Sequence, residues 1–281
     1  MRFAGDSDYI RSRWRTDPGA ALGAEVGGEL AGSNFATNWG SVGFFGPLTV
    51  LPDLWGLGIA QRLLEPTMAI FDKWGTQHRG LYTFSNSPKH IALYQKFGFW
   101  PRDLTAIMSK EISPKPADSN WTRFSKLSPP GRAGSLRDCR ELTNEIYAGL
   151  DVTREILAVA DQNLGDTVLL GDSSRLVALA VCHCGPGSEA GSGTCYLKFG
   201  AVRPGPYAAR DFGRLLDACQ QLAAERGLTR FVAGMNLARV EAYRRMAAFG
   251  FRADVLGVLM ATLSTSPGYN RPDVFLIDDW R

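Results

Sequence analysis

The fold is decided by the stretch Leu48-Thr49-Val50-Leu51-Pro52, which continues through Asp53 and Leu54 into Trp55-Gly56-Leu57-Gly58-Ile59-Ala60. Apolar residues that end at a proline are typical of a buried strand, and the glycines that follow predict a loop. From Gln61 onward the pattern is that of a helix. A helix N-terminus behind a glycine loop presents free backbone N–H groups and the positive end of the helix dipole, which suit a phosphate. The stretch therefore predicts a strand, a phosphate-binding loop and a helix in succession.

A second motif lies one βα unit later, in His90-Ile91-Ala92-Leu93-Tyr94-Gln95-Lys96-Phe97-Gly98-Phe99. It predicts a short helix that carries a tyrosine and ends at Gly98. Glycine loops alone are common, whereas a glycine loop together with a tyrosine-bearing helix at this distance is a specific pattern.

The whole segment returns once at a constant offset of 152 residues, with Val50 on Val202, Phe97-Gly98-Phe99 on Phe249-Gly250-Phe251, and Met108 on Met260. One offset across the window predicts a tandem repeat of one α/β unit, the alternative being chance matches at hydrophobic positions. The copies differ where chemistry is expected, because Gly56 becomes Ala208, Gly58 becomes Arg210 and Tyr94 becomes Met246. Packing residues are kept and chemical ones are not, which predicts one working site, in the first half.

Composition sets the outer limits. A chain of 281 residues is long enough for two domains with a core each, and its 45% hydrophobic and 21% charged residues are ordinary for a globular protein. The net charge is only +3, and no basic run with interleaved aromatics occurs, so nucleic acid is not an expected partner. No signal-peptide core follows Met1, and no apolar run approaches about 18 residues, so we expect a cytoplasmic protein without membrane contact.

All five cysteines lie in the second half, and their odd number favours free thiols. Cys182-His183-Cys184 raises a metal hypothesis. In a strand, however, the two thiols share a face while His183 points away, and the spacing is not that of a CxxC pair. We therefore expect core thiols and no metal site.

The remaining patterns predict a fold of the α/β class with a mixed α+β sheet. We expect two tandem domains, each a central mixed sheet flanked by helices, over residues 1–112 and 121–281, with a proline-bearing linker at 113–120. In the first domain we expect helices over 8–15, 60–74 and 88–97, a hairpin over 20–38, and strands over 42–51, 80–84 and 105–112. In the second we expect strands over 121–127, 167–171, 176–184, 195–202, 231–234 and 254–263, and helices over 137–164, 207–226 and 237–249.

The two domains are not equally complete. The strand expected at Trp121 has no counterpart before the first hairpin, so the opening strand and first helix of the first domain are expected to be missing. Either the start of the chain is recorded too late, or another segment fills the gap. The strand-like tail Asp273–Asp278 either fills that place or forms the last strand of the second domain, and we favour the second interpretation.

Taken together, Val50-x-Pro52, Gly56-x-Gly58-x-Ala60 and Ala92-Leu93-Tyr94-x-Lys96-x-Gly98-Phe99 resemble the GCN5-related N-acetyltransferase (GNAT) superfamily. The resemblance covers most of residues 20–112 and, more weakly, 121–263. It implies acetyl-CoA as co-substrate, with its pyrophosphate on the loop amides and its pantetheine and acetyl group along the preceding strand. The residues so implicated are Leu48, Thr49 and Val50 on the strand, Trp55, Gly56, Leu57, Gly58, Ile59 and Ala60 in the loop, and Ser87. Trp55 replaces the usual Arg or Gln of the loop, and Ser87 replaces the family's asparagine.

The resemblance also places Tyr94 near the thioester sulfur. Attack by an amine expels a thiolate, which a phenol can protonate, and strand amides can stabilise the oxyanion. The alternative is a core tyrosine with its hydroxyl at the surface. The sequence does not identify the base that deprotonates the amine, since the strand before the loop carries no carboxylate. The candidates are a water chain, Glu25 and Glu29. Asn34, Asn38 and Trp39 are candidates for the border of the acceptor pocket, and His78 and His90 are expected at the surface.

The sequence therefore predicts an acetyl-CoA-dependent transfer of an acetyl group to a primary amine, by direct attack in a ternary complex in the first domain. The acceptor is a small-molecule or peptide amine, and the chain is a monomer or a homodimer. Arg210 favours a second domain without a site, although Asn236 and Tyr243 leave a second site open. A non-enzymatic acyl-CoA-binding or regulatory module is the alternative function. No GxxxxGK[ST] loop occurs, which argues against a nucleotide triphosphatase.

Overall fold

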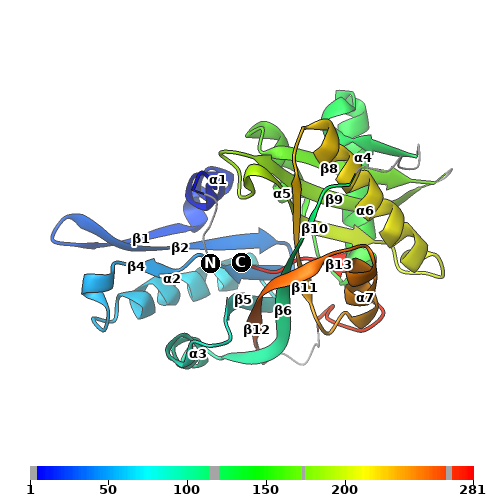
Figure 1. Ribbon diagram of the computed structural model, residues 1–281. Helices are drawn as coiled ribbons and strands as arrows, with labels where there is room; N and C mark the ends of the chain where they lie inside the picture. Colours follow the sequence, from blue (N-terminus) through cyan, green and yellow to red (C-terminus); the bar gives the residue numbers. More distant parts are fainter. Residues whose placement is uncertain (1–4, 114–119, 173–174, 264–267) are drawn as a thin grey trace.

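The computed structural model describes residues 5–113, 120–172, 175–263 and 268–281 (Figure 1). Its α-helices are α1 (Tyr9–Thr16), α2 (Ile59–Trp74), α3 (Pro88–Gln95), α4 (Pro129–Ile146), α5 (Thr153–Asp161), α6 (Ala208–Glu225) and α7 (Val240–Ala248). Its strands are β1 (Ala21–Val26), β2 (Glu29–Trp39), β3 (Val42–Phe45), β4 (Thr49–Val50), β5 (His78–Phe84), β6 (Phe99–Glu111), β7 (Trp121–Arg123), β8 (Gly165–Gly171), β9 (Leu176–Gly185), β10 (Gly191–Val202), β11 (Arg230–Asn236), β12 (Arg252–Thr262) and β13 (Leu276–Ile277). No helix in these ranges is both long and apolar enough to cross a membrane.

The strands form one continuous sheet in the order β1-β2-β3-β5-β12-β6-β11-β10-β9-β8-β7, with β4 attached to β2 and β13 attached to β10 (Figure 1). Two pairs are parallel, β3 with β5 and β10 with β11, while the neighbouring pairs are antiparallel. The mixed α/β class predicted from the sequence is therefore confirmed, with one half of the chain at each end of the sheet.

The halves exchange strands at the centre of this sheet. β6 of the first half lies between β12 and β11, which both belong to the second half. β12 in turn lies between β5 and β6. Each half thus supplies a strand that the other half needs for a continuous sheet, so the two halves are interlocked.

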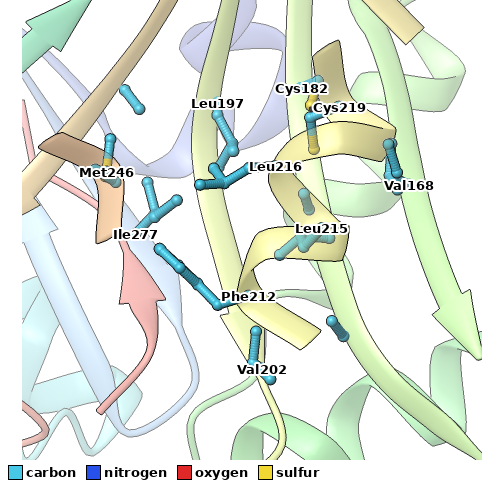
Figure 2. Close-up of a cluster of buried hydrophobic side chains, with 14 of the residues drawn as sticks. Val168, Cys182, Leu197, Val202, Phe212, Leu215, Leu216, Cys219, Met246 and Ile277 are labelled. Atoms are coloured by element: carbon cyan, nitrogen blue, oxygen red, sulfur yellow. Dashed lines mark hydrogen bonds between the residues drawn. The ribbon is translucent and has the colours of Figure 1, made fainter. Parts of the chain in front are cut away.

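The core of the second half forms where α6 covers β8, β9 and β10 (Figure 2). Its apolar residues Phe212, Leu215, Leu216 and Cys219 follow the spacing of one helical face. The thiols of Cys182 and Cys219 lie 3.9 Å apart within this cluster. His183 points to the opposite face of β9, as the alternation of a strand predicts.

The strand expected over residues 42–51 is not continuous, and this prediction is wrong. It breaks at the corner Gly46–Pro47 into β3, which pairs with β5, and β4, which pairs with β2. Leu51 is half exposed rather than buried. The strand expected from Trp121 ends at Arg123 and continues as a short 3₁₀-helix. Residues 114–119 of the expected linker lie outside the described residues.

The tail belongs to the second half, as the sequence interpretation favoured, and does not complete the first. Ile277 of β13 lies opposite Gly200 of β10. A buried ion pair between Arg239 and Asp278 holds the tail in place. Beyond it, Trp280 packs against Phe44 and His78 of the first half. His78 is consequently 5% exposed, so its expected place at the surface is wrong.

Candidate active site

The first half contains a gap between two strands that begin as neighbours. β3 and β5 pair as far as Phe44 and Gly80, after which β4 turns to pair with β2. A cavity of about 560 Å³ fills the space between the diverging strands. Its lining consists of Gly5, Ser7, Asp8, Tyr9, Ile10, Phe45, Gly46, Pro47, Leu48, Thr49, Leu81, Tyr82, Thr83, Phe84, His90, Tyr94 and Arg281.

The cavity passes from one face of the sheet to the other. Leu81 and Thr83 point to the face that α3 covers, where Tyr94 and His90 complete the wall. Tyr82 points to the opposite face, toward the wall that the segment around α1 forms. Two ligands can therefore approach the same point from opposite sides of the sheet.

Tyr94 lies in the wall on the α3 side and is 7% exposed. Its ring meets Phe45 of β3 edge-on, with 5.7 Å between ring centroids. Burial raises the pKa of Tyr94 to about 12, so the phenol keeps its proton at neutral pH. In the described part of the chain no side chain forms a hydrogen bond with this hydroxyl, which leaves it available to a ligand.

The glycine loop has the form that its sequence predicts. Gly56 and Gly58 adopt φ angles of +85° and +77°, and no atom lies within 4 Å of a Cβ built at either residue. Gly58 is the N-cap of α2, and no side chain caps this helix. The first N–H groups of α2 therefore face an open cradle without a side-chain cap, an arrangement that binds phosphates at other helix N-termini.

The other predicted cofactor residues lie at different places. Leu48 and Thr49 line the cavity, whereas Val50 and Ser87 do not. Ser87 is the N-cap of α3 through its backbone carbonyl, which accepts from His90 and Ile91. Trp55, Leu57, Ile59 and Ala60 belong to the loop and the start of α2, outside the cavity wall.

Trp55 occupies an ordered position although its side chain is exposed. Its indole N–H donates to the carbonyl of Val50 at 2.9 Å. The Nζ of Lys89 lies 5.2 Å from the centre of its ring. This contact joins the start of α2 to the start of α3.

The residues predicted for the acceptor side have other roles. Glu25 and Glu29 are exposed near the hairpin turn and do not line the cavity. The amide of Asn34 donates to Thr67 in the core, and Trp39 packs on Phe199. Asn38 accepts from the N–H of Gly40.

The wall on the α1 side consists of residues that sequence reasoning missed: Ser7, Asp8, Tyr9, Tyr82 and Arg281. They come from the start of the described chain, from β5 and from the tail. No local pattern marks them, because the tail reaches the first half only through tertiary packing.

The corresponding gap in the second half is filled by the chain itself. β10 and β11 pair from Thr194 to Leu197 and then diverge, and β13 lies against β10 beyond that point. The side chain of Ile277 enters the core under α6 (Figure 2). Asp279 lies so close to Gly234 of β11 that a Cβ there would meet it at 2.1 Å.

The loop of the second half also differs. Arg210, at the counterpart of Gly58, lies inside α6, stacks on Tyr207 at 4.5 Å and pairs with Asp211. Asn236, one of the two residues that left a second site open, is buried, and its amide donates to Thr105.

Comparisons with known proteins agree with this architecture. Residues 2–99 match the Acetyltransferase (GNAT) family. A Pyrococcus horikoshii structure described as a candidate acetyltransferase aligns with a TM-score of 0.68 at 12% identity, over 94% of this chain and 80% of its own. No curated protein sequence matches the chain significantly.

Two further structures are similar. A GCN5-related N-acetyltransferase from Sphaerobacter thermophilus aligns with a TM-score of 0.54 at 17% identity, over 86% of this chain and 79% of its own. A tandem GNAT protein from the clavulanic acid biosynthesis pathway aligns with a TM-score of 0.54 at 12% identity, over 89% of this chain and 86% of its own. The family model therefore matches the first part of the chain, and the whole chain has the fold of the tandem GNAT structure, with two GNAT-like halves.

Proposed function

We propose that the first half transfers an acetyl group from acetyl-CoA to a primary amine, and that the cavity between β4 and β5 is the active site. One contrast carries this proposal. The gap beside Tyr94 is open, whereas its counterpart in the second half is filled by β13 and Asp279. The site therefore belongs to the half that also keeps the glycine loop.

Different segments of the first half bind different parts of acetyl-CoA. The open cradle at Gly56 and Gly58 and the N–H groups that begin α2 receive the pyrophosphate. The backbone of Leu48 and Thr49 borders the gap and receives the pantetheine arm and the thioester. The thioester then lies across the cavity from Tyr94.

The acceptor amine enters from the α1 side, between Tyr9 and Tyr82. Its nitrogen attacks the thioester carbonyl, a C–N bond forms, and the C–S bond breaks with release of a thiolate. The buried phenol of Tyr94 donates its proton to that sulfur. Water in the cavity takes up the proton that the amine gives up, and a proton from the solvent then restores the phenol of Tyr94.

One observation favours the alternative, a module that binds acyl-CoA without chemistry. Asp8 is the one Asp or Glu side chain in the lining of the cavity within the described residues. It is already engaged as the N-cap of α1, where it accepts from the N–H of Arg11 at 2.8 Å. Among the described residues, this wall therefore offers no Asp or Glu side chain that is free to act as a base on the amine.

Thiol release from acetyl-CoA over a panel of amines distinguishes the two functions. We expect release with at least one amine class, and calorimetry should show one acetyl-CoA bound per chain. The variant Gly58→Arg, which copies the second half, should abolish binding. Binding without thiol release for every amine would favour the binding module, and two molecules bound per chain would contradict the assignment of one site.

A further inference from the structure

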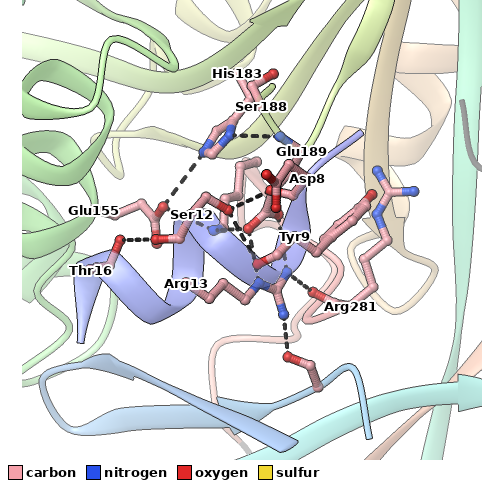
Figure 3. Close-up of polar contacts among 12 residues, drawn as sticks. Asp8, Tyr9, Ser12, Arg13, Thr16, Glu155, His183, Ser188, Glu189 and Arg281 are labelled. Carbon is pink, nitrogen blue, oxygen red and sulfur yellow. Dashed lines mark hydrogen bonds and ion pairs between the residues drawn. The ribbon is translucent and has the colours of Figure 1, made fainter. Parts of the chain in front are cut away.

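The guanidinium of Arg13 lies where the two halves meet and donates to two backbone carbonyls at the border of the cavity (Figure 3). Nη1 donates to the carbonyl of Gly46, and Nη2 donates to the carbonyl of Arg281. Both acceptor residues line the cavity. Arg13 is only 6% exposed, so water competes little for these hydrogen bonds.

The charge of Arg13 is balanced by Glu189, which belongs to the connection between β9 and β10 in the second half. Nε of Arg13 lies 2.9 Å from Oε1 of Glu189, and Nη2 lies 3.0 Å from Oε2. This two-point contact fixes the plane of the guanidinium. Burial alone would raise the pKa of Glu189, but Arg13 and Lys198 hold it well below its usual range. Glu189 is therefore an anion at neutral pH.

A second pair completes the charge balance behind Glu189. The Nζ of Lys198 lies 2.8 Å from Glu189 and 2.9 Å from Glu155. Burial raises the pKa of Glu155, but Lys198 and the adjacent His183 lower it to about 2. Two carboxylates thus face two cations in a buried cluster. Since each charge has a partner, the cluster holds Arg13 in one position.

Gly46 is the residue at which the strand leaves β5 and opens the gap. Its N–H donates to the carbonyl of Phe35 at 2.9 Å, and its φ of +148° favours glycine. Its carbonyl is held by Arg13. The Gly46–Pro47 corner determines the direction of the chain that follows it. It therefore also determines where Leu48 and Thr49 lie across the cavity from Tyr94.

We propose that Arg13, fixed by Glu189, is a positioning residue that holds the Gly46 corner and thereby places the acyl-binding strand opposite Tyr94. The proposal rests on the acetyl-CoA site proposed above. It assigns a task to the second half, whose own gap is filled: through Glu189 it sets the geometry of the active site in the first half.

The variant Arg13→Lys tests this role. Its ammonium keeps the positive charge but cannot bind one carboxylate and two carbonyls in a single plane. We expect kcat to fall about tenfold while KM for the amine stays unchanged, because charge-assisted hydrogen bonds are lost from the acyl strand. The Kd of acetyl-CoA should rise about fivefold and that of CoA by less than about twofold, since CoA lacks the acetyl group that this strand holds. Glu189→Gln should act in the same direction.

Arg154→Lys is the matched control. Arg154 of α5 pairs with Asp17 near α1, so it also joins the two halves, but Asp17 does not line the cavity and the side chain of Arg154 is half exposed. It should leave kcat and both Kd values unchanged, with every value normalised to folded protein by circular dichroism. Equal effects of Arg13→Lys and Arg154→Lys, or equal weakening of acetyl-CoA and CoA, would overturn the proposal.

Calorimetric binding measurements distinguish a failure of this proposal from a failure of the proposed enzyme activity. If the wild-type chain binds acetyl-CoA but acetylates no amine, the proposed enzyme activity fails, and the ratio of the two Kd values still decides the role of Arg13. If the wild-type chain binds neither ligand, both proposals are overturned.

Discussion

The indole of Trp280 lies against the α carbon of Gly80, so closely that a Cβ at position 80 would come within 2.1 Å of the ring. Trp280 belongs to the tail of the second half, and Gly80 belongs to β5 of the first half. The same ring is stacked on Phe44 of β3, with an interplanar angle of 3°. The tail therefore packs against both β3 and β5 at the point where these two strands begin to diverge.

We expect Gly80→Ala to destabilise the protein by about 1–3 kcal/mol, because the added methyl group overpacks the contact with Trp280. Thermal unfolding measures the change. Gly213→Ala is the control, since Gly213 lies inside α6 and a Cβ there meets nothing within 4 Å. It should stabilise the protein by up to about 1 kcal/mol. Similar unfolding temperatures for Gly80→Ala and the wild type would contradict the packing.

Tyr94→Phe should lower kcat about 10²-fold, because the departing thiolate loses its proton donor. The Kd of acetyl-CoA should stay within about twofold, since the phenol is one contact among many in the site. The acid form of Tyr94 is present below its pKa of about 12, so it should contribute no loss of rate between pH 6 and 10. Stopped-flow or steady-state rates across that pH range measure the effect.

Tyr243→Phe is the corresponding control in the second half. Tyr243 lies on α7 and packs against the second core, so its hydroxyl should not affect turnover. A wild-type rate for Tyr94→Phe would remove the proton-donor role. A large loss for Tyr243→Phe would instead point to a second active site.

The local features of the site follow from the sequence because they depend on neighbouring residues. Two glycines with one residue between them before a helix predict the positive φ angles of Gly56 and Gly58, which the structure has. The short helix predicted before Gly98 is present as α3, which ends at Gln95 and carries Tyr94 into the cavity wall. Turn chemistry and helical period are local properties, so they can be read without the fold.

The features that join the halves could not be predicted in this way. β6 and β12 have the same apolar alternation at one offset, so either order in the sheet satisfies the pattern. His78 looks like a surface residue until Trp280, 202 positions later, covers it. Arg13 and Glu189 are 176 residues apart, and the local sequence around each predicts an ordinary charged side chain at the surface. Partner choice over such separations depends on tertiary packing.

Lys89→Ala should weaken acetyl-CoA binding about fivefold, because Lys89 lies at the N-terminus of α3 beside Trp55, which precedes the proposed phosphate-binding loop. The salt dependence of the Kd should also become shallower, since one exposed cation fewer faces the phosphates. Calorimetry at two salt concentrations measures both effects. Lys96→Ala, an exposed lysine at the other end of α3, should change neither. Equal effects of the two variants would show that only overall charge matters.

His78 should make the stability of the protein depend on pH between about 6.5 and 4. Burial lowers the pKa of His78 from 6.5 to about 4. As the pH falls through this range, the unfolded chain takes up the proton first, so the free energy of unfolding decreases. The contribution is complete above pH 6.5, amounts to about 3 kcal/mol at most, and is lost by about pH 4.

His78→Phe should reduce this slope, because an aromatic ring of similar size keeps the contact with Trp280 but cannot be protonated. Denaturant unfolding of the wild type and the variant at several pH values gives the difference, from which the shared carboxylate contributions cancel. His90→Gln, at an exposed position, should keep the wild-type slope. If His78→Phe and the wild type lost stability in parallel from pH 6.5 to 4, the histidine would be reached by solvent in the folded state, and the tail would not seal it as the structure indicates.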